Sequence, residues 1–264
     1  MPLSKKDGLK LTALATLFLL FALAAREFLR ITLIKRGAPA TTATDASTFA
    51  GIVLLTATLW PLFHRFRLSL SRFFQRPKSI PATMIAGLIG GVLCRLLDWV
   101  LLLTNKGHVD QLLSATIDCA TPEVESTAIV ALALPLAEEI THRGVLLAGL
   151  IPFGTLIAIL VTALVFAVLH TTLLSPFVFG VVSAALALRT GSLWVPLIAH
   201  CTFNLLSITE AACLRVVTNN PEGLQLGWPV ILSLIIVLLL SLAGLIRLSG
   251  TGALAHPGAL PAGR

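Results

Sequence analysis

The sequence predicts an all-α fold: a polytopic membrane helix bundle with about eight transmembrane helices. Hydrophobic residues make up 56% of the 264-residue chain and charged residues only 12%, whereas an ordinary soluble domain is about 25% charged. The mean hydropathy is +0.95. The apolar residues are gathered into segments close to the ~20 residues that cross a bilayer. Water alone does not solvate such a surface, so soluble, disordered and disulfide-scaffold classes are excluded.

The first three spans are expected at residues 9–27, 49–63 and 81–103. The first follows a cluster of lysines and consists mainly of Leu, Ala and Phe, so it is either a retained span or a cleavable secretory signal. The second is short but can cross if its ends reach the headgroups. The polar loop 104–126 comes next, and its acidic residues are expected to solvate it.

Four closely spaced spans follow, at residues 127–150, 152–169, 171–188 and 193–208. Breakers between them, such as Pro152, Pro176 and Gly191, allow tight hairpins. These four helices should therefore be neighbours.

The eighth span is expected at residues 228–248, which completes a single transmembrane domain over 1–248. The tail 249–264 is rich in Gly, Ala and Pro and is predicted to be disordered. Cys94 and Cys201 lie in apolar spans as small core residues. Cys119 and Cys213 lie in loops on one side of the membrane, so a disulfide between them and two free thiols are both open alternatives.

Most Lys and Arg residues outside the spans fall on one side of the membrane if the N-terminus is cytoplasmic. The positive-inside rule then places both termini on the cytoplasmic side of the membrane, which we expect to be a bacterial inner membrane. Arg30, Lys35 and Arg36 are the exception, because they follow the expected end of the first span. The basic and apolar segment 64–76 lies either in the interface on anionic lipid or in water as a solvated loop. The net charge of +7 therefore reflects contact with the lipid bilayer, and no nucleic-acid partner is implied.

Ionisable residues inside the spans should be paired, buried in protein or functional, because lipid does not solvate charge. Arg95 and Asp98 are three residues apart, and Glu139 and Arg143 are four apart, so each pair shares a helical face and should form a salt bridge. Glu138 points about 100° away from its neighbour. Glu139 is thus paired with Arg143, and the carboxylate of Glu138 remains free to take up and release a proton.

Histidine and asparagine side chains lie on the helices that follow. His200 and Asn204 are four residues apart and project from one face. His170 closes the fifth span. Since the helices are neighbours, these side chains and Glu138 can converge in one polar pocket, although interhelical hydrogen bonds alone are an alternative explanation.

This set of side chains fits peptide hydrolysis without a covalent intermediate. A carboxylate and an imidazole can deprotonate a water molecule, and imidazole and amide donors can stabilise the oxyanion. No G-x-S-x-G elbow supports a serine mechanism. Zinc bound by Glu138, His170 and His200 is an alternative, but the H-E-x-x-H spacing is absent. A non-enzymatic membrane protein, such as an immunity factor, is the other main alternative.

Three motifs on successive hydrophobic helices carry a family resemblance. The motifs are Glu138-Glu139-x-x-x-Arg143, Phe166-x-x-x-His170 and His200-x-x-x-Asn204. In this order they resemble the signature motifs of the CPBP intramembrane protease family, also called the Abi or CAAX-protease-like family. The resemblance covers about residues 127–208. It implies a glutamate-type intramembrane endopeptidase, without catalytic metal or other cofactor, that acts on a membrane-anchored peptide or protein.

The resemblance also implies a role for each motif residue. Glu138 would be the general base, and His170 would help to orient the water. His200 and Asn204 would form the oxyanion hole. Three further residues would shape the site: Glu139, Arg143 and Phe166. Family members that act on prenylated proteins work toward the cytosol, whereas the predicted topology puts His170 at an external end, so either the span boundaries differ or the site opens outward.

Overall fold

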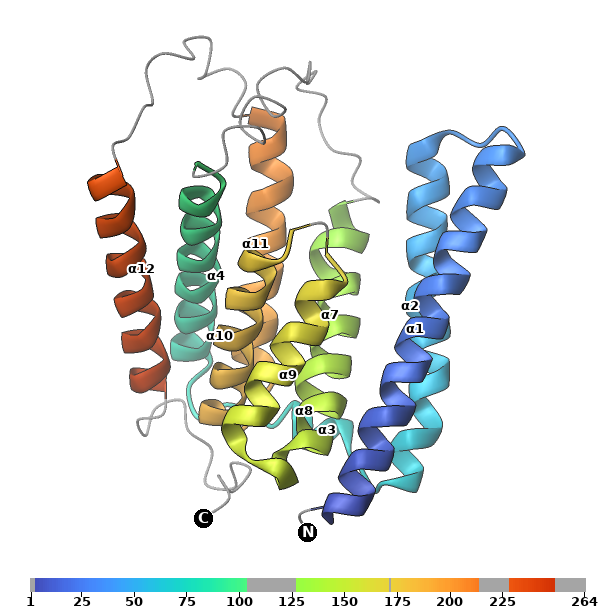
Figure 1. Ribbon diagram of the computed structural model, residues 1–264, viewed down its shortest axis with the longest axis horizontal. Coiled ribbons are helices and arrows are strands. Elements are labelled where there is room, and N and C mark those ends of the chain that lie inside the picture. The colour runs from blue at the N-terminus through green and yellow to red at the C-terminus, as the bar shows by residue number, and fades with distance from the viewer. Residues whose placement is uncertain (1–2, 104–126, 171, 214–227, 250–264) are drawn as a thin grey trace.

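The computed structural model describes residues 3–103, 127–170, 172–213 and 228–249, and in these ranges the chain forms helices and turns without a strand (Figure 1). The fold of this part is all-α, as predicted. The loop 104–126, the Cys119–Cys213 disulfide and the tail beyond residue 249 fall outside the described residues. Of the described cysteines, Cys94 and Cys201 are free thiols.

The first two helices form an antiparallel hairpin, α1 (Lys5–Lys35) and α2 (Ala40–Arg65). Both are longer than expected, so the predicted bounds 9–27 and 49–63 are wrong. The expected first span ended at charged residues, but Glu27 and Arg30 form an ion pair at 2.5 Å on the helix surface, so both are compatible with a continuous helix. Arg30 and Lys35 therefore lie within α1 rather than in a loop.

The connection from α2 to α4 (Ile80–Leu103) contains the short helix α3 (Leu70–Phe73) and packs against the start of a later helix. The backbone N–H of Leu193 donates to the carbonyl of Phe73 at 2.7 Å. The ring of Phe74 packs edge-on against Trp194, with centroids 5.1 Å apart. The aromatic side chains of the segment 64–76 thus pack on protein, while its arginines stay exposed.

The helical region that holds the two adjacent glutamates alternates between π and α geometry. Its parts are η1 (Ile129–Ala133, π), α7 (Leu134–Glu139), η2 (Ile140–Leu146, π) and α8 (Leu147–Leu150). A 3₁₀ turn, η3 (Ile151–Phe153), follows, and Gly154 at φ +118° reverses the chain into α9 (Thr155–Val168). The expected hairpin at Pro152 is confirmed.

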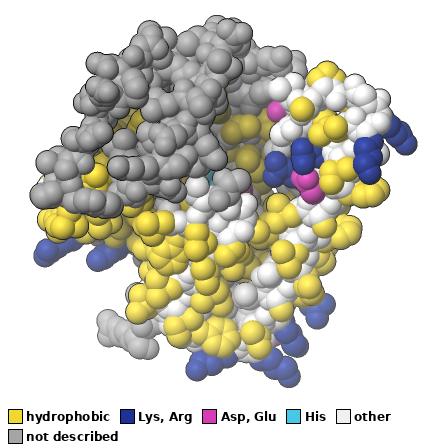
Figure 2. Space-filling model, turned by 45° about the horizontal axis from the view of Figure 1, so that its top comes forward, with side chains coloured by type: hydrophobic (Ala, Val, Ile, Leu, Met, Phe, Trp, Pro, Cys, Tyr) yellow, Lys and Arg dark blue, Asp and Glu magenta, His cyan; other side chains and the backbone are white. Residues whose placement is uncertain are grey.

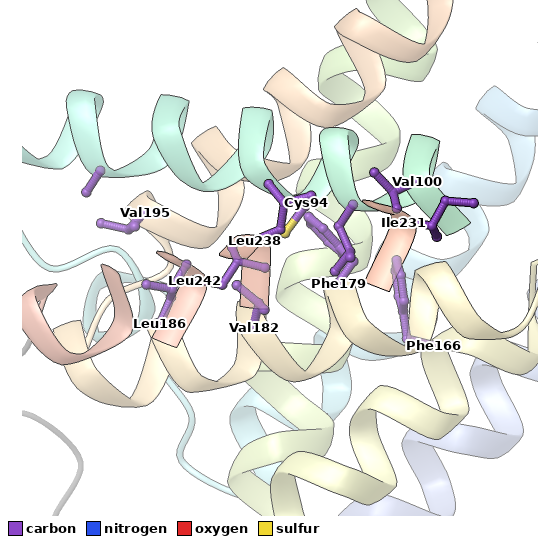
Figure 3. Close-up of a cluster of buried hydrophobic side chains, with 12 residues drawn as sticks. Cys94, Val100, Phe166, Phe179, Val182, Leu186, Val195, Ile231, Leu238 and Leu242 are labelled. Carbon is purple, nitrogen blue, oxygen red and sulfur yellow. The ribbon is translucent and has the colours of Figure 1, made fainter. Parts of the chain in front are cut away.

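The remaining helices are α10 (Leu174–Thr190), α11 (Trp194–Cys213) and α12 (Trp228–Ser249). Close contacts join α9 to α10, α10 to α11 and α11 to η1 and α7, so the expected neighbours are neighbours. A Cβ atom on Gly91 of α4 would lie 2.5 Å from the carbonyl oxygen of Ala199, so these backbones touch. A core of apolar side chains fills the space between α4, α10, α11 and α12 (Figure 3).

Four described helices are long and apolar enough to cross a membrane: α1, α2, α4 (over Ile80–Leu101) and α12 (over Ile231–Leu248). Three shorter apolar helices accompany them, at Thr155–Val168, Leu174–Thr190 and Trp194–Ile208. Figure 2 shows broad hydrophobic surfaces on the flanks of the molecule. The chain is an integral membrane protein, and its first and last described helices begin and end at the same end of the bundle (Figure 1).

Candidate active site

The carboxylate of Glu139 lies fully buried where η2, α10 and α11 meet. Its Oε1 atom accepts a hydrogen bond from Nδ1 of His200 at 2.9 Å and lies 3.1 Å from Nη1 of Arg143. Its Oε2 atom accepts a hydrogen bond from the hydroxyl of Ser183 at 2.9 Å. The predicted Glu139–Arg143 salt bridge is confirmed. Both oxygens of this carboxylate are therefore occupied.

The imidazole of His200 lies between the two adjacent glutamates. Its Nδ1 faces Glu139, and its Nε2 lies 3.4 Å from Oε2 of Glu138. The side chain of His200 is 3% exposed and that of Glu138 is 19% exposed. Because a carboxylate only accepts hydrogen bonds, the tautomer assigned to His200 carries a hydrogen on Nδ1, and Nε2 is the ring nitrogen that faces Glu138.

Neighbouring residues of an α-helix point about 100° apart, yet both carboxylates reach one ring. The π-helical segment η2 begins directly after Glu139, and such wide turns are frequent at functional sites. Two side chains bond to the carbonyls at this junction. Thr141 Oγ1 donates to the carbonyl of Ala137 at 2.7 Å, and Nδ1 of His142 lies 2.9 Å from the carbonyl of Glu138.

The ring of Phe166 is the common neighbour of the polar side chains. Its centroid lies 4.4 Å from the ring of His170, 5.3 Å from that of His142 and 5.7 Å from that of His200. The guanidinium carbon of Arg143 lies 4.4 Å from the same centroid, within the range of a cation–π contact. Phe166 is 2% exposed. The middle motif thus contributes the apolar centre around which the charged groups are arranged.

His170 and Asn204 lie at the margin of this cluster. Nδ1 of His170 lies 2.8 Å from the carbonyl of Phe166, and the imidazole is exposed beyond the end of α9. Asn204 Nδ2 donates to the carbonyl of Val130 at 2.9 Å. Between described residues, no hydrogen bond joins either side chain to Glu138. Both side chains therefore lie beside the cluster without contacting the carboxylate of Glu138 through a hydrogen bond.

The three motifs thus converge on one buried cluster. Residues 122–206 match the family model described as Type II CAAX prenyl endopeptidase Rce1-like. The resemblance inferred from the motifs is confirmed, and the matched residues include all of them. No curated protein and no solved structure matches the chain significantly. Helices α1, α2, α4 and α12 lie outside the Rce1-like segment.

Ser183 and Phe179 belong to the Rce1-like cluster although neither was predicted from the sequence. Ser183 is 1% exposed, and the ring of Phe179 lies 4.7 Å from that of His200. Both lie on α10, four residues apart and on one helical face. A lone serine in an apolar helix is the only signal in the sequence, and it does not distinguish a contact to a carboxylate from a bond within the helix.

Within the described part of the chain, no group of three or more His, Cys, Asp or Glu side chains is arranged to hold a metal ion. Glu138, His170 and His200, the ligand set of the zinc alternative, do not form such a group. Three buried nitrogens of the site have no hydrogen-bond partner among described residues: Nη1 and Nη2 of Arg143 and Nε2 of His142. The imidazole of His142 faces the aromatic cluster around Phe166.

Proposed function

We propose that this protein is an intramembrane endopeptidase that hydrolyses a peptide bond in a membrane-anchored peptide or protein. The observation that carries the proposal is the difference between two adjacent glutamates. Glu139 is buried and bonded through both oxygens, whereas the side chain of Glu138 is 19% exposed and, among described residues, its one ion-pair contact is to His200 at 3.4 Å. A general base must reach water and keep a free oxygen, and only Glu138 of the two meets both requirements.

In the proposed reaction Glu138 takes a proton from a water molecule that His170 helps to orient. The water oxygen attacks the carbonyl carbon of the scissile peptide bond, and the carbonyl π electrons move onto its oxygen. Glu138 then passes the proton to the amide nitrogen, the C–N bond breaks, and an acid and an amine leave. No covalent enzyme intermediate forms.

His200 and Asn204 are the proposed oxyanion donors. With Nδ1–H bonded to Glu139, His200 can donate from Nε2 only as an imidazolium. Asn204 uses one amide hydrogen on the carbonyl of Val130 and keeps a second hydrogen for substrate. Such fixed donors stabilise charge that develops in the transition state.

We further propose that eight helical segments cross the membrane, with both termini in the cytoplasm of a bacterial cell, and that the site opens to the opposite face. The side chains toward that face, His170 and Asn204, are exposed or partly exposed. Toward the termini the site is closed by Val145 and Leu146, which are 0% and 1% exposed. The substrate peptide would then approach from the non-cytoplasmic side.

The test uses the full-length protein reconstituted in liposomes with two probes: a prenylated CaaX peptide and a peptide with a transmembrane anchor. We expect cleavage of at least one probe, and we expect Glu138→Gln to reduce it to background. The matched control is Glu27→Gln, which removes an exposed carboxylate outside the site and should leave cleavage unchanged. Thermal unfolding of each variant separates a catalytic loss from a folding defect.

Three results would count against the proposal. If the Glu138→Gln variant cleaves at the same rate as the unsubstituted protein, Glu138 is not the general base. Loss of cleavage with a zinc chelator, restored by added zinc, would favour the metal mechanism. If neither probe is cleaved while a cell expressing the protein is protected from a bacteriocin, and Glu138→Gln retains this protection, the non-enzymatic alternative would hold.

A further inference from the structure

The start of α1 and the end of α2 enclose a cavity at the terminal end of the hairpin, outside the Rce1-like segment. Its volume is about 270 Å³. The residues that line it are Leu3, Asp7, Lys10, Arg65, Phe66 and Arg67. Figure 1 shows that these two helix ends lie side by side at the end of the bundle where α1 begins and α12 ends. For helices that cross a membrane, this is the level of the lipid headgroups.

The cavity is positively charged. Lys10, Arg65 and Arg67 contribute three cations, and Asp7 is the only acidic residue in the lining. The side chain of Asp7 accepts a hydrogen bond from the hydroxyl of Ser4 at 2.6 Å, as part of the N-cap of α1. Among described residues, no salt bridge joins Asp7 to any of the three cations. Their charge is therefore not neutralised within the cavity.

Helix stability does not account for the positive charge at this end of α1. The amino end of a helix carries partial positive charge and favours acidic side chains. Nevertheless Lys5 and Lys6 occupy the first turn, and Lys10 follows one turn later. The helix dipole and the lysines add to one another, which makes this end a site for an anion.

Arg67 occupies a backbone conformation that favours glycine. Its φ is +53°, and it is the one described residue other than glycine with positive φ. The turn is closed by hydrogen bonds from the N–H of Phe66 to Leu62 and from the N–H of Leu68 to Phe63, both 2.9 Å long. Glycine would form this turn with less strain. Arginine at this position therefore strains the backbone, but it supplies a guanidinium group that lines the cavity and that glycine would lack.

The cavity also has apolar walls, Leu3 and Phe66, beside its cations. Guanidinium and ammonium groups bind phosphate through charge-assisted hydrogen bonds, and an apolar wall beside them fits the glycerol and first acyl carbons of a lipid. We propose that this cavity binds the phosphate headgroup of an anionic phospholipid. A zwitterionic headgroup would leave the excess positive charge uncompensated, so the ligand is an anionic lipid such as phosphatidylglycerol.

The test titrates the purified full-length protein in a neutral detergent with short-chain phosphatidylglycerol and follows binding by calorimetry. The double variant Lys10→Gln/Arg67→Gln removes one cation from each helix. We expect binding to weaken about thirty-fold, the effect of removing two basic residues from an anionic lipid surface. The matched control is Arg76→Gln/Lys78→Gln, which removes two exposed cations from the α2–α4 connection outside the cavity. We expect it to weaken binding less than threefold.

A second variant, Arg67→Gly, tests the cavity with a substitution that should not impair folding. It relieves the positive φ, so thermal stability should be unchanged or higher, while lipid binding should weaken about fivefold through the loss of one cation. Unchanged binding by this variant would overturn the proposal, as would equal losses in the two double variants, which indicate a diffuse surface potential.

Two further ligands identify the chemistry that is recognised. Short-chain phosphatidylcholine should bind at least tenfold more weakly than phosphatidylglycerol, and equal binding would overturn the role of charge. Inorganic phosphate should also bind more weakly, and equal binding would make this a site for a free anion rather than for a lipid. None of these measurements uses proteolysis, so the outcome is independent of the proposed function.

Discussion

Replacement of Arg143 by methionine should destabilise the protein by about 3–5 kcal/mol, the usual effect of removing one partner of a buried ion pair. Arg143 and Glu139 have side chains that are 1% and 0% exposed, with Nη1 and Oε1 3.1 Å apart. After the substitution, the carboxylate keeps the hydrogen bonds from Ser183 and His200 but loses the guanidinium charge that lies 3.1 Å away. The contact between the guanidinium and Phe166 is lost as well.

The double variant Glu139→Gln/Arg143→Met distinguishes this explanation from loss of packing volume. The amide oxygen of glutamine can still accept from Ser183 or His200, and no charge of the pair is left buried. The double substitution should therefore cost less than the sum of the two single substitutions, with a coupling energy of about 2–3 kcal/mol. Equilibrium unfolding by sodium dodecyl sulfate in mixed micelles measures all four proteins.

The matched control is the exposed pair on α1, Glu27 and Arg30, whose side chains are 52% and 34% exposed. Each single substitution there, Glu27→Gln or Arg30→Met, should change the free energy of unfolding by less than about 1 kcal/mol. If the effects of the Glu139 and Arg143 substitutions add to within ~0.5 kcal/mol, the buried charge is not what stabilises the site, and the reasoning fails.

The same unfolding titration tests three further predictions. Ser183→Ala should cost about 1–3 kcal/mol because it removes a buried hydrogen bond to the carboxylate of Glu139, and a loss near zero would mean that water replaces the hydroxyl. Gly144→Ala should cost about 1–3 kcal/mol, since its Cβ would lie 2.8 Å from Cε2 of Phe73; Phe73→Leu in the same chain should recover most of this, and no recovery would contradict the steric explanation. Asn204→Asp should cost about 1–3 kcal/mol because a carboxylate would replace the donor to Val130, and an unchanged midpoint would show that this hydrogen bond contributes little.

The fold was predictable where hydropathy or helix breakers determine it. Apolar segments located the helices, and Pro152 and Gly191 located two of the turns. The extent of α1 was underestimated because hydropathy treats Glu27 and Arg30 as a break, although the two side chains pair on the helix surface. Hydropathy counts each charge as a break in a span, whereas two opposite charges three residues apart stabilise the helix they share.

The local parts of the site followed from helical spacing. The Glu139–Arg143 salt bridge joins residues four apart on one helix, so any regular helix through them makes it. The Ser183–Glu139 bond joins different helices and depends on how closely α10 approaches its neighbour. On the same helix, a Cβ atom on Gly180 would lie 2.8 Å from Cα of Ala163, so this glycine permits the close approach of α10 to α9. Nothing in the sequence indicates which residue lies opposite a glycine.

One histidine can face two adjacent glutamates because its two ring nitrogens lie on different sides of the ring. Glu138 and Glu139 are consecutive residues of α7, so their side chains leave the helix about 100° apart. The ring of His200 lies between them, with Nδ1 toward Glu139 and Nε2 toward Glu138. Burial then distinguishes two chemically identical side chains: Glu139 lies deeper and is held by Ser183 and His200, while Glu138 stays partly exposed. The same residue type at two adjacent positions can thus supply a structural anion and the proposed base, because the two positions differ in burial and in hydrogen-bond partners.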